Sequence, residues 1–376
     1  MRFAQSGDKY MKDQRHILLW LQSLRGIAAL LIVVCHSRLF LPDQWQQALS
    51  VDFFVPLAMG VDLFFMLSGF IMVVTTQDFC GGGQYAWRFL IKRFARIWPA
   101  YAVVSLLALI IQHHGFRAFT DKLSLVPFIE SLFFIPVDPS VKVYFGMPLP
   151  VAWTLCFEFY FYLVLAVSML FGAKRWLVVA SWFVLTLVVA PLVRGTPFFD
   201  VAGQPPIFSW RYLNLVFNPV IWDFVFGLLI GWVYISSVRI KNTAVLKLAL
   251  FGTFTLAIWA VAAGITTFHG PAGWGAPVAL CMLTLALLSK EQDIRFPIWT
   301  IYLGASSYSL YLLHLLVFGV VERAGNHLKW LDPARLHTSY FLLAPAAAII
   351  LSIVFFSSVE KPVSRWARDT LLGKKA

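Results

Sequence analysis

The chain has 376 residues, of which 60% are apolar and only 13% are charged, and its mean hydropathy is +0.77. Soluble globular proteins carry about 25% charged residues, so this composition excludes a soluble domain and predicts an integral membrane protein. The net charge of +12 does not indicate nucleic-acid binding, because the basic residues lie in short loops between apolar runs. Four scattered cysteines show neither metal-ligand spacing nor a disulfide framework.

Apolar runs of membrane-spanning length recur along the whole sequence and predict an all-α bundle of about ten transmembrane helices. If successive loops lie on alternate sides, twenty of the thirty Lys and Arg residues fall on the side of the two termini and nine on the other, with Arg25 inside the membrane. The positive-inside rule then places both termini in the cytoplasm. The predicted spans are residues 18–40, 53–75, 95–112, 150–171, 175–193, 216–236, 245–267, 274–289, 300–321 and 339–358.

The two longest loops, near 113–149 and 194–215, then face outward, and the first includes an apolar piece expected to be amphipathic or re-entrant. There is no internal repeat and no soluble domain in the sequence. We therefore expect residues 1–376 to form one transmembrane domain, with any chemistry inside the bundle or at its two faces.

The segment RGIAALLIVVCH begins at Arg25 and ends at His36. These two residues lie within about 20° of the same helix face and roughly 16 Å apart along the axis. Ionisable residues inside an apolar run usually face the bundle interior and mark a functional path. The alternative is that Arg25 reaches lipid headgroups and His36 is a satisfied residue at a helix end.

A second group of polar residues lies in KRFARIWPAY, where Arg93 and Arg96 are three positions apart. Such residues are about 60° apart around a helix, so both guanidinium groups can present on one face and bind phosphate oxygens. Together with Arg25 they would suit a polyphosphate ligand at the cytoplasmic end. The alternative is an ordinary basic anchor at the membrane surface.

Two carboxylates lie within apolar segments, Asp62 in GVDLFFMLSGF and Glu158 in PVAWTLCFEFYFY. Each is costly to bury alone and needs a partner. Asp62 could orient His36 and stabilise its cation, and Glu158 could pair with His36 or Arg25. Purely structural hydrogen bonds or ion pairs remain the alternative for both.

Other polar residues give weaker signals. Asp223 is expected to be interfacial, His314 to be a packed core histidine, and His269 to lie beside an outward loop without metal-ligand spacing. Glu360 could pair with an inner arginine. No metal site is expected anywhere in the chain.

Taken together, these segments resemble the membrane-bound acyltransferase family 3 over nearly the whole chain. The resemblance is carried by Arg25 and His36, by GVDLFFMLSGF, by Arg93 and Arg96 followed by Ile-Trp-Pro-Ala-Tyr, by PVAWTLCFEFYFY, by SYSLYLLH and by the late Glu-Lys-Pro. Their order within ten spans makes the match specific.

The resemblance implies transfer of an acyl group, usually acetyl, from cytoplasmic acyl-coenzyme A to a hydroxyl of a cell-surface or lipid-linked glycan. It implies that His36 is the catalytic histidine and that Arg25, Arg93 and Arg96 bind the donor. From the residues themselves, we expect Asp62 or Glu158 to orient His36. Some family members carry an added soluble C-terminal domain, which we do not expect in this sequence. We expect a multi-pass protein of a bacterial inner membrane, surrounded by lipids, and the sequence leaves a homo-oligomer open.

His36 can act either as a general base on the acceptor hydroxyl or as a transient acyl carrier. Cys35 points about 100° away from His36, which argues against an acyl-cysteine. The competing hypothesis is a membrane transporter that uses the same ionisable residues. An inverted repeat would favour transport, and the sequence shows none.

Overall fold

A computed structural model describes residues 2–42, 44–45, 49–78, 81–112, 121–138, 140–141, 144–201, 208–327 and 337–373, and for residues 2–18, 327, 337 and 338 it describes the backbone only. Throughout these ranges the chain is helical and contains no strand. The helices are α1 Arg2–Ser37, α3 Gly60–Thr76, α4 Gly83–Gln112, α5 Lys122–Leu132, α6 Trp153–Met169, α7 Arg175–Val184, α8 Ala190–Arg194, α9 Arg211–Val216, α10 Ile221–Ile235, α11 Thr243–Ala262, α12 Gly275–Ser289, α13 Ile298–Ala305, α14 Ser307–His327, α15 His337–Phe355 and α16 Lys361–Leu371.

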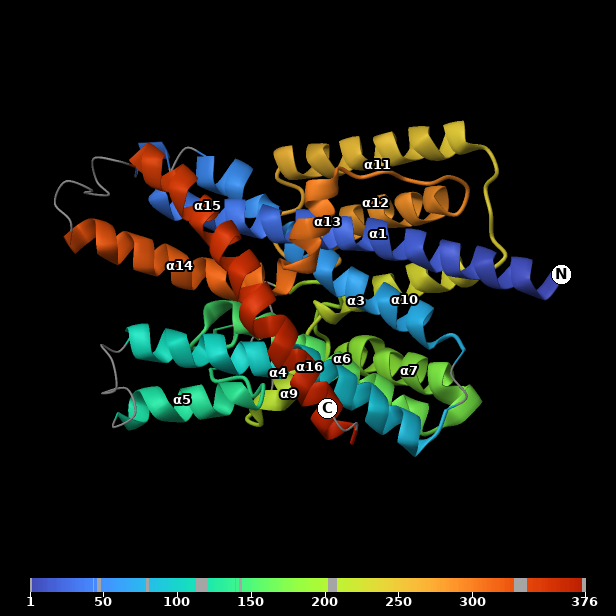
Figure 1. The fold of residues 1–376 in the computed structure, drawn as a ribbon, viewed down its shortest axis with the longest axis horizontal. Coiled ribbons are helices and arrows are strands. Elements are labelled where there is room, and N and C mark those ends of the chain that lie inside the picture. Colours follow the sequence, from blue (N-terminus) through green and yellow to red (C-terminus); the bar gives the residue numbers. More distant parts are fainter. Residues whose placement is uncertain are drawn as a thin grey trace.

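The long helix α1 runs beside α3 and α10, and the α11–α12 pair covers this group on one side (Figure 1). A second group contains α4, α5, α6 and α7. Helix α14 packs against both α1 and α15, and the chain then crosses obliquely to α16, which packs on α4. The polar residues predicted from the sequence lie on helices that face one another between these two groups.

Each of the ten predicted spans coincides with a helical segment. Seven helices in the described part of the chain are long and apolar enough to cross a membrane, and the bent pair α13–α14 makes an eighth if it counts as one span. The apolar helices α10 and α12 are shorter. The number ten and the cytoplasmic location of the termini stay predictions.

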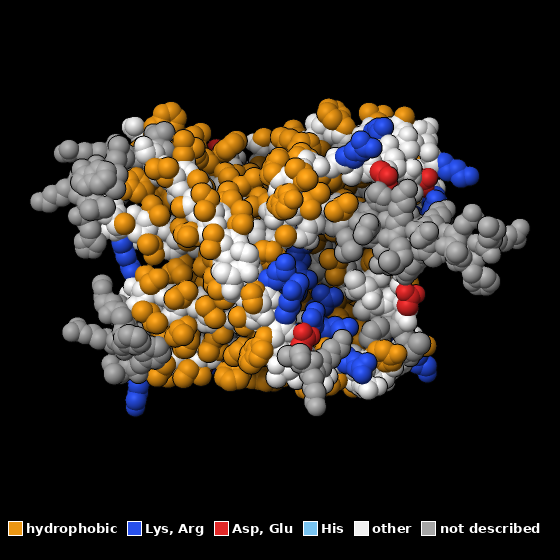
Figure 2. All heavy atoms as spheres, in the orientation of Figure 1, with side chains coloured by type: hydrophobic (Ala, Val, Ile, Leu, Met, Phe, Trp, Pro, Cys, Tyr) orange, Lys and Arg blue, Asp and Glu red, His pale blue; other side chains and the backbone are white. Residues whose placement is uncertain are grey.

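Apolar side chains cover most of the face seen in Figure 2, while Lys and Arg gather along α16 and near the end where the chain begins. On α11, large side chains point outward, with Leu248 71% exposed, Phe251 69% and Phe254 59%. Such a surface is stable in lipid and not in water. It supports the composition-based prediction of an integral membrane protein.

Glycine allows α3 and α10 to pack backbone against backbone. A Cβ added at Gly227 would lie 2.1 Å from the carbonyl oxygen of Met66, and one added at Gly69 would lie 2.3 Å from that of Phe224. Small residues at such crossings let membrane helices approach closely. The crossing holds the first turn of α3, which carries Asp62, against the start of α10.

The two long loops are tied together by an ion pair. Arg211 on α9 donates two hydrogen bonds to the Glu130 carboxylate on α5 and a third, of 2.8 Å, to the carbonyl oxygen of Val137. The hydrogen bonds from Arg211 hold the pKa of Glu130 below its ordinary value. The apolar piece in the first loop is the helix α5, packed on α4. The parts of these loops at 113–120 and 202–207 lie outside the described residues.

We predict that Gly227→Ala destabilises the fold, because the new methyl group would overlap the Met66 carbonyl. Overpacking of this kind costs about 1–3 kcal/mol. The matched control is Gly319→Ala on α14, where an added Cβ meets nothing within 4 Å. Removing a helical glycine there should stabilise by up to about 1 kcal/mol. Thermal unfolding in detergent or nanodiscs measures both, and equal melting temperatures for the two variants would contradict this account of the crossing.

Candidate active site

Arg25 is positioned by a close crossing between α1 and α13. A Cβ added at Gly26 would lie 2.3 Å from the carbonyl oxygen of Thr300, and one at Gly304 would lie 1.8 Å from that of Gln22. The chain then bends by 74° between α13 and α14. This bend brings the first residue of α14, Ser307, next to α1.

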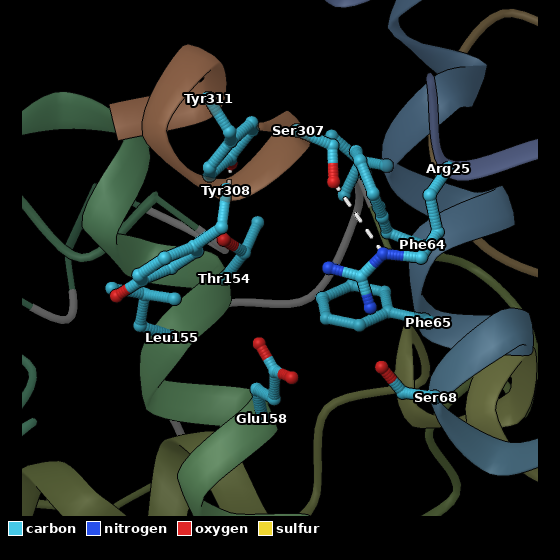
Figure 3. A pocket seen from close by; sticks show the side chains of 11 residues that line it. Arg25, Phe64, Phe65, Ser68, Thr154, Leu155, Glu158, Ser307, Tyr308 and Tyr311 are labelled. Atoms are coloured by element: carbon cyan, nitrogen blue, oxygen red, sulfur yellow. Dashed lines mark hydrogen bonds between the residues drawn. The ribbon is translucent and has the colours of Figure 1, made fainter. Parts of the chain in front are cut away.

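Arg25 reaches into a pocket between α1, α3, α6 and α14. Its Nε donates a hydrogen bond of 3.4 Å to the hydroxyl oxygen of Ser307. Figure 3 shows the guanidinium group on one wall and the Glu158 carboxylate on the wall formed by α6. The lining residues are Arg25, Val61, Phe64, Phe65, Ser68, Thr154, Leu155, Glu158, Ser307, Tyr308 and Tyr311.

The pocket belongs to a larger group of charges. Arg25 interacts electrostatically with Arg96, Glu158 and Glu360, and Arg93 interacts with Arg96 and Glu158. Arg96 is exposed, whereas Arg25 and Arg93 are half-buried. The three arginines therefore extend from the surface of the protein to the pocket, a distribution that suits a long anionic ligand entering from this end.

Neighbouring side chains fix the orientation of this group. The guanidinium carbon of Arg93 lies 5.4 Å and 5.6 Å from the ring centroids of Phe89 and Tyr162. The Tyr162 hydroxyl donates a hydrogen bond to Glu158, and the Ser309 hydroxyl donates one to the buried Glu360. Cation–π contacts and carboxylate hydrogen bonds both restrict side-chain rotation, so the charges are held in place before any ligand binds.

His36 contacts a second histidine, His314, from the adjacent helix. The Nε2 of His314 lies 3.2 Å from the Nδ1 of His36. The Nδ1 of each ring also lies near the carbonyl oxygen four residues earlier, 3.0 Å from that of Ile32 and 3.1 Å from that of Leu310. His314 is fully buried and His36 is half-buried.

These contacts assign the protons of the two neutral rings. A carbonyl oxygen can only accept a hydrogen bond, so the Nδ1 of both His36 and His314 must carry a proton. The unprotonated Nε2 of His314 then accepts from the Nδ1–H of His36. The Nε2 of His36 keeps its lone pair and has no hydrogen-bond partner within the described ranges. His36 is therefore prepared to act as a base or a nucleophile.

Tyr311 connects the pocket to the histidine pair. Its ring lines the pocket. The centroid of this ring lies 6.0 Å from that of Phe64 and 6.0 Å from that of His314. Its hydroxyl donates to the carbonyl oxygen of Val151 and accepts from Thr154, both at 3.0 Å. The charged group, the pocket and the histidine pair thus follow one another along α1 and α14.

Asp62 lies apart from His36 and binds other groups. Its Oδ2 lies 2.8 Å from the Nδ1 of His269, and its Oδ1 accepts a hydrogen bond of 2.8 Å from the backbone N–H of Gly270. Asp62 is fully buried and His269 is 4% exposed. A separate carboxylate–imidazole pair therefore exists beside the histidine pair.

The structure brings some of the predicted site residues together. Arg25 and Glu158 line one pocket, and Arg93, Arg96 and Glu360 interact electrostatically with one or both of them. The expectation that Asp62 or Glu158 orients His36 is not met, because Asp62 binds His269, Glu158 binds Tyr162 and His36 binds His314. The catalytic and donor-binding roles of these residues stay predictions.

Two functional candidates were missed or misjudged. His314 was expected to be a packed core histidine; it is fully buried, and it also hydrogen bonds to His36, so it is not an isolated histidine. Its spacing carried a signal, since Ser307, Tyr311 and His314 recur at four and then three residues, which is one helix face. Asp223 was expected to be interfacial and is fully buried. In the described part of the chain, no group of three or more His, Cys, Asp and Glu side chains is arranged so that it could hold a metal ion.

Comparison with known proteins identifies the family to which this sequence belongs. Residues 18–357 match the family described as "Acyltransferase domain". The chain is 30% identical over 319 residues to the exopolysaccharide production protein ExoZ of Rhizobium meliloti (strain 1021), covering 83% of this chain and 90% of that protein. It is 24% identical over 344 residues to nodulation protein 10 of Rhizobium leguminosarum bv. viciae, covering 85% of each.

A third relative is the acyltransferase MdmB of Streptomyces mycarofaciens, which is 24% identical over 393 residues, covering 94% of this chain and 92% of that protein. No solved structure gives a significant match. The family match spans most of the chain and includes every residue that lines the pocket. The chain therefore belongs to the acyltransferase 3 family and is an enzyme that transfers acyl groups.

Proposed function

We propose that this enzyme transfers an acyl group, most simply acetyl, from acyl-coenzyme A to a hydroxyl of a cell-surface or lipid-linked glycan across a bacterial inner membrane. The observation that carries the proposal is the continuous arrangement of three arginines, a pocket and the His36–His314 pair. Membership of an acyltransferase family favours this function over transport.

The arginines suit the anionic end of coenzyme A. Its pyrophosphate and ribose phosphate would bind Arg93, Arg96 and Arg25, because guanidinium groups form paired hydrogen bonds with phosphate oxygens. The thin pantetheine arm would pass through the pocket. His36 lies eleven residues beyond Arg25 on α1, roughly 16 Å along the axis, where the thioester would arrive.

His36 would then use its free Nε2, either to take the proton of the acceptor hydroxyl or to attack the thioester carbon. Both routes leave a positive charge on the His36 ring. His314 would stabilise that charge by accepting the Nδ1–H hydrogen bond, as a carboxylate does in a hydrolase triad. The glycan acceptor is supported by the relative ExoZ, which is named for exopolysaccharide production.

We predict that His36→Ala lowers acyl transfer to surface polysaccharide by at least about 100-fold, since general acid–base groups contribute 100-fold to 10,000-fold. Binding of acyl-coenzyme A, measured by calorimetry on the purified protein, should be preserved. The matched control is Cys35→Ser, one position away, which should retain activity. Unchanged transfer in His36→Ala would refute the proposed role of this histidine.

We predict that His314→Leu lowers kcat about 10-fold to 100-fold with little change in the KM for acyl-coenzyme A. A hydrogen bond to a charged group contributes about 1.5–3 kcal/mol, and each 1.4 kcal/mol is about a factor of ten in rate. His314→Gln restores an acceptor oxygen and should recover part of the loss. If Gln and Leu give the same kcat, the contribution of His314 is packing alone.

We predict that Arg93→Ala and Arg96→Ala each weaken acyl-coenzyme A binding by about tenfold, with a larger loss in the double variant, because each removes charged hydrogen bonds to phosphate. The control is Arg88→Ala, an exposed cation on the same helix that points about 140° away from Arg93. Binding of free coenzyme A, which lacks the acyl group, should fall in parallel. Equal affinity for acyl-coenzyme A in the double variant and the wild type would show that Arg93 and Arg96 do not form the donor site.

A further inference from the structure

His269 and Asp62 form a buried, hydrogen-bonded pair, which is more than a packing contact. His269 lies in the loop between α11 and α12, and Asp62 lies in the first turn of α3. The carboxylate uses one oxygen for the His269 ring and the other for the Gly270 N–H, each at 2.8 Å. The loop and the helix are thus joined at one buried side chain.

Glycines shape this loop around the carboxylate. Gly270 has a φ of +92°, which residues with a side chain rarely adopt. A Cβ added at Gly273 would lie 1.7 Å from the carbonyl oxygen of Phe268, and one at Gly275 would lie 2.0 Å from the Oδ1 of Asp223. Asp223 on α10 is a second buried acid that interacts with Asp62. In the sequence, this loop corresponds to the glycine-rich segment HGPAGWG, residues 269–275.

The pairing fixes the protonation of His269. An ionised carboxylate only accepts hydrogen bonds, so the Nδ1 of His269 carries a proton and donates it to Asp62. The Nε2 then holds a lone pair, and it has no hydrogen-bond partner among the residues that the structure describes. This is the arrangement by which a buried carboxylate orients a catalytic base.

His269 also lies at the same end of the bundle as His36. The two rings interact electrostatically. Gly60, two residues before Asp62, packs on α1 about two turns before the helix reaches His36. An added Cβ there would lie 2.4 Å from the carbonyl oxygen of Ala28 and 3.0 Å from the side chain of Ile32. The structure therefore holds two oriented imidazoles, each with a free Nε2, one on α1 and one in the loop between α11 and α12.

Aromatic rings surround His269 and reach the surface. The centroids of Trp274 and Trp153 lie 5.0 Å and 5.5 Å from that of His269. Tyr144, which is 40% exposed, contacts Trp153 with 5.4 Å between centroids and Phe268 with 6.2 Å. Sugar rings stack their C–H faces on exposed aromatic rings, so Tyr144 offers an entry surface for a saccharide.

We propose that His269, oriented by Asp62, is the base that takes the proton of the acceptor hydroxyl, while His36 carries the acyl group. The inference rests on the proposed function. An acylated His36 cannot serve as base because its Nε2 is occupied, so a route through an acyl-histidine requires a second base.

The two steps balance as follows. First, the Nε2 of His36 attacks the thioester carbon, the C–S bond breaks, and coenzyme A leaves as a thiolate, giving a cationic acyl-His36. Next, the acceptor oxygen attacks the acyl carbon, its proton passes to the Nε2 of His269, and the C–N bond breaks to return neutral His36. The protonated His269 is stabilised by Asp62 and releases its proton to water, and the thiolate takes up one proton from water.

The test uses the full-length enzyme in nanodiscs with radiolabelled acetyl-coenzyme A and two acceptors, an oligosaccharide and hydroxylamine. Hydroxylamine attacks acyl-imidazoles without a general base. In His269→Gln, which retains a hydrogen-bond donor for Asp62, acetyl transfer to the oligosaccharide should fall by about 100-fold. Labelled acyl-enzyme should accumulate, and transfer to hydroxylamine should stay within a few-fold of the wild type.

The outcomes separate this inference from the proposed function. His36→Ala should form no acyl-enzyme and serve neither acceptor, and if it still transfers acetyl, the proposed function of His36 fails. If His269→Gln transfers to the oligosaccharide at the wild-type rate, His269 is not the base. Loss of both acceptors, or failure of His269→Gln to form an acyl-enzyme, would assign His269 to the fold or to the first step and would equally overturn the inference.

Discussion

A polar group buried in an apolar bundle must find its hydrogen-bond partner within the protein, because lipid offers none. This constraint accounts for the contacts of the two buried groups that flank the site. The fully buried His314 binds His36 and its own helix backbone, and the fully buried Asp62 binds His269 and Gly270. The contact with His314 occupies the Nδ1 of His36, and the contact with Asp62 occupies the Nδ1 of His269. Each leaves the Nε2 of that ring free, so the requirement for burial also sets the tautomer on which the proposed chemistry depends.

Close backbone contacts bring these groups within reach of one another. The crossing of α1 and α13 at Gly26 and Gly304 leaves no room for side chains, and the 74° bend that follows turns α14 along α1. The polar face of α14 therefore lies opposite the face of α1 that carries Arg25 and His36.

The sequence was a good guide to the helices and an incomplete guide to their contacts. Apolar runs located a helical segment for each predicted span, and the spacing of Arg25 and His36 correctly placed them on one helix that lines the site. Which carboxylate faces which histidine depends on the rotation and depth of neighbouring helices, and local spacing does not determine these. The sequence therefore offered either Asp62 or Glu158 as the partner of His36, whereas the tight glycine loop at residues 268–275 presents His269 to Asp62. The helix bend at Ser306 left no proline signal in the sequence.

The proposed mechanism, in which one histidine carries the acyl group and another acts as the base, also requires that water be excluded from the site. An acyl-imidazole reacts readily with water, so an enzyme that forms one must keep water away until the acceptor arrives. Trp274 and Trp153 are 2% and 4% exposed and pack directly on the His269 ring. Their exclusion of water would also strengthen the hydrogen bond between Asp62 and His269, because electrostatic interactions are stronger in apolar surroundings. The same rings would thus keep water from the base and hold it in place, and the exposed Tyr144 beside them would be the point at which an arriving sugar displaces the remaining water.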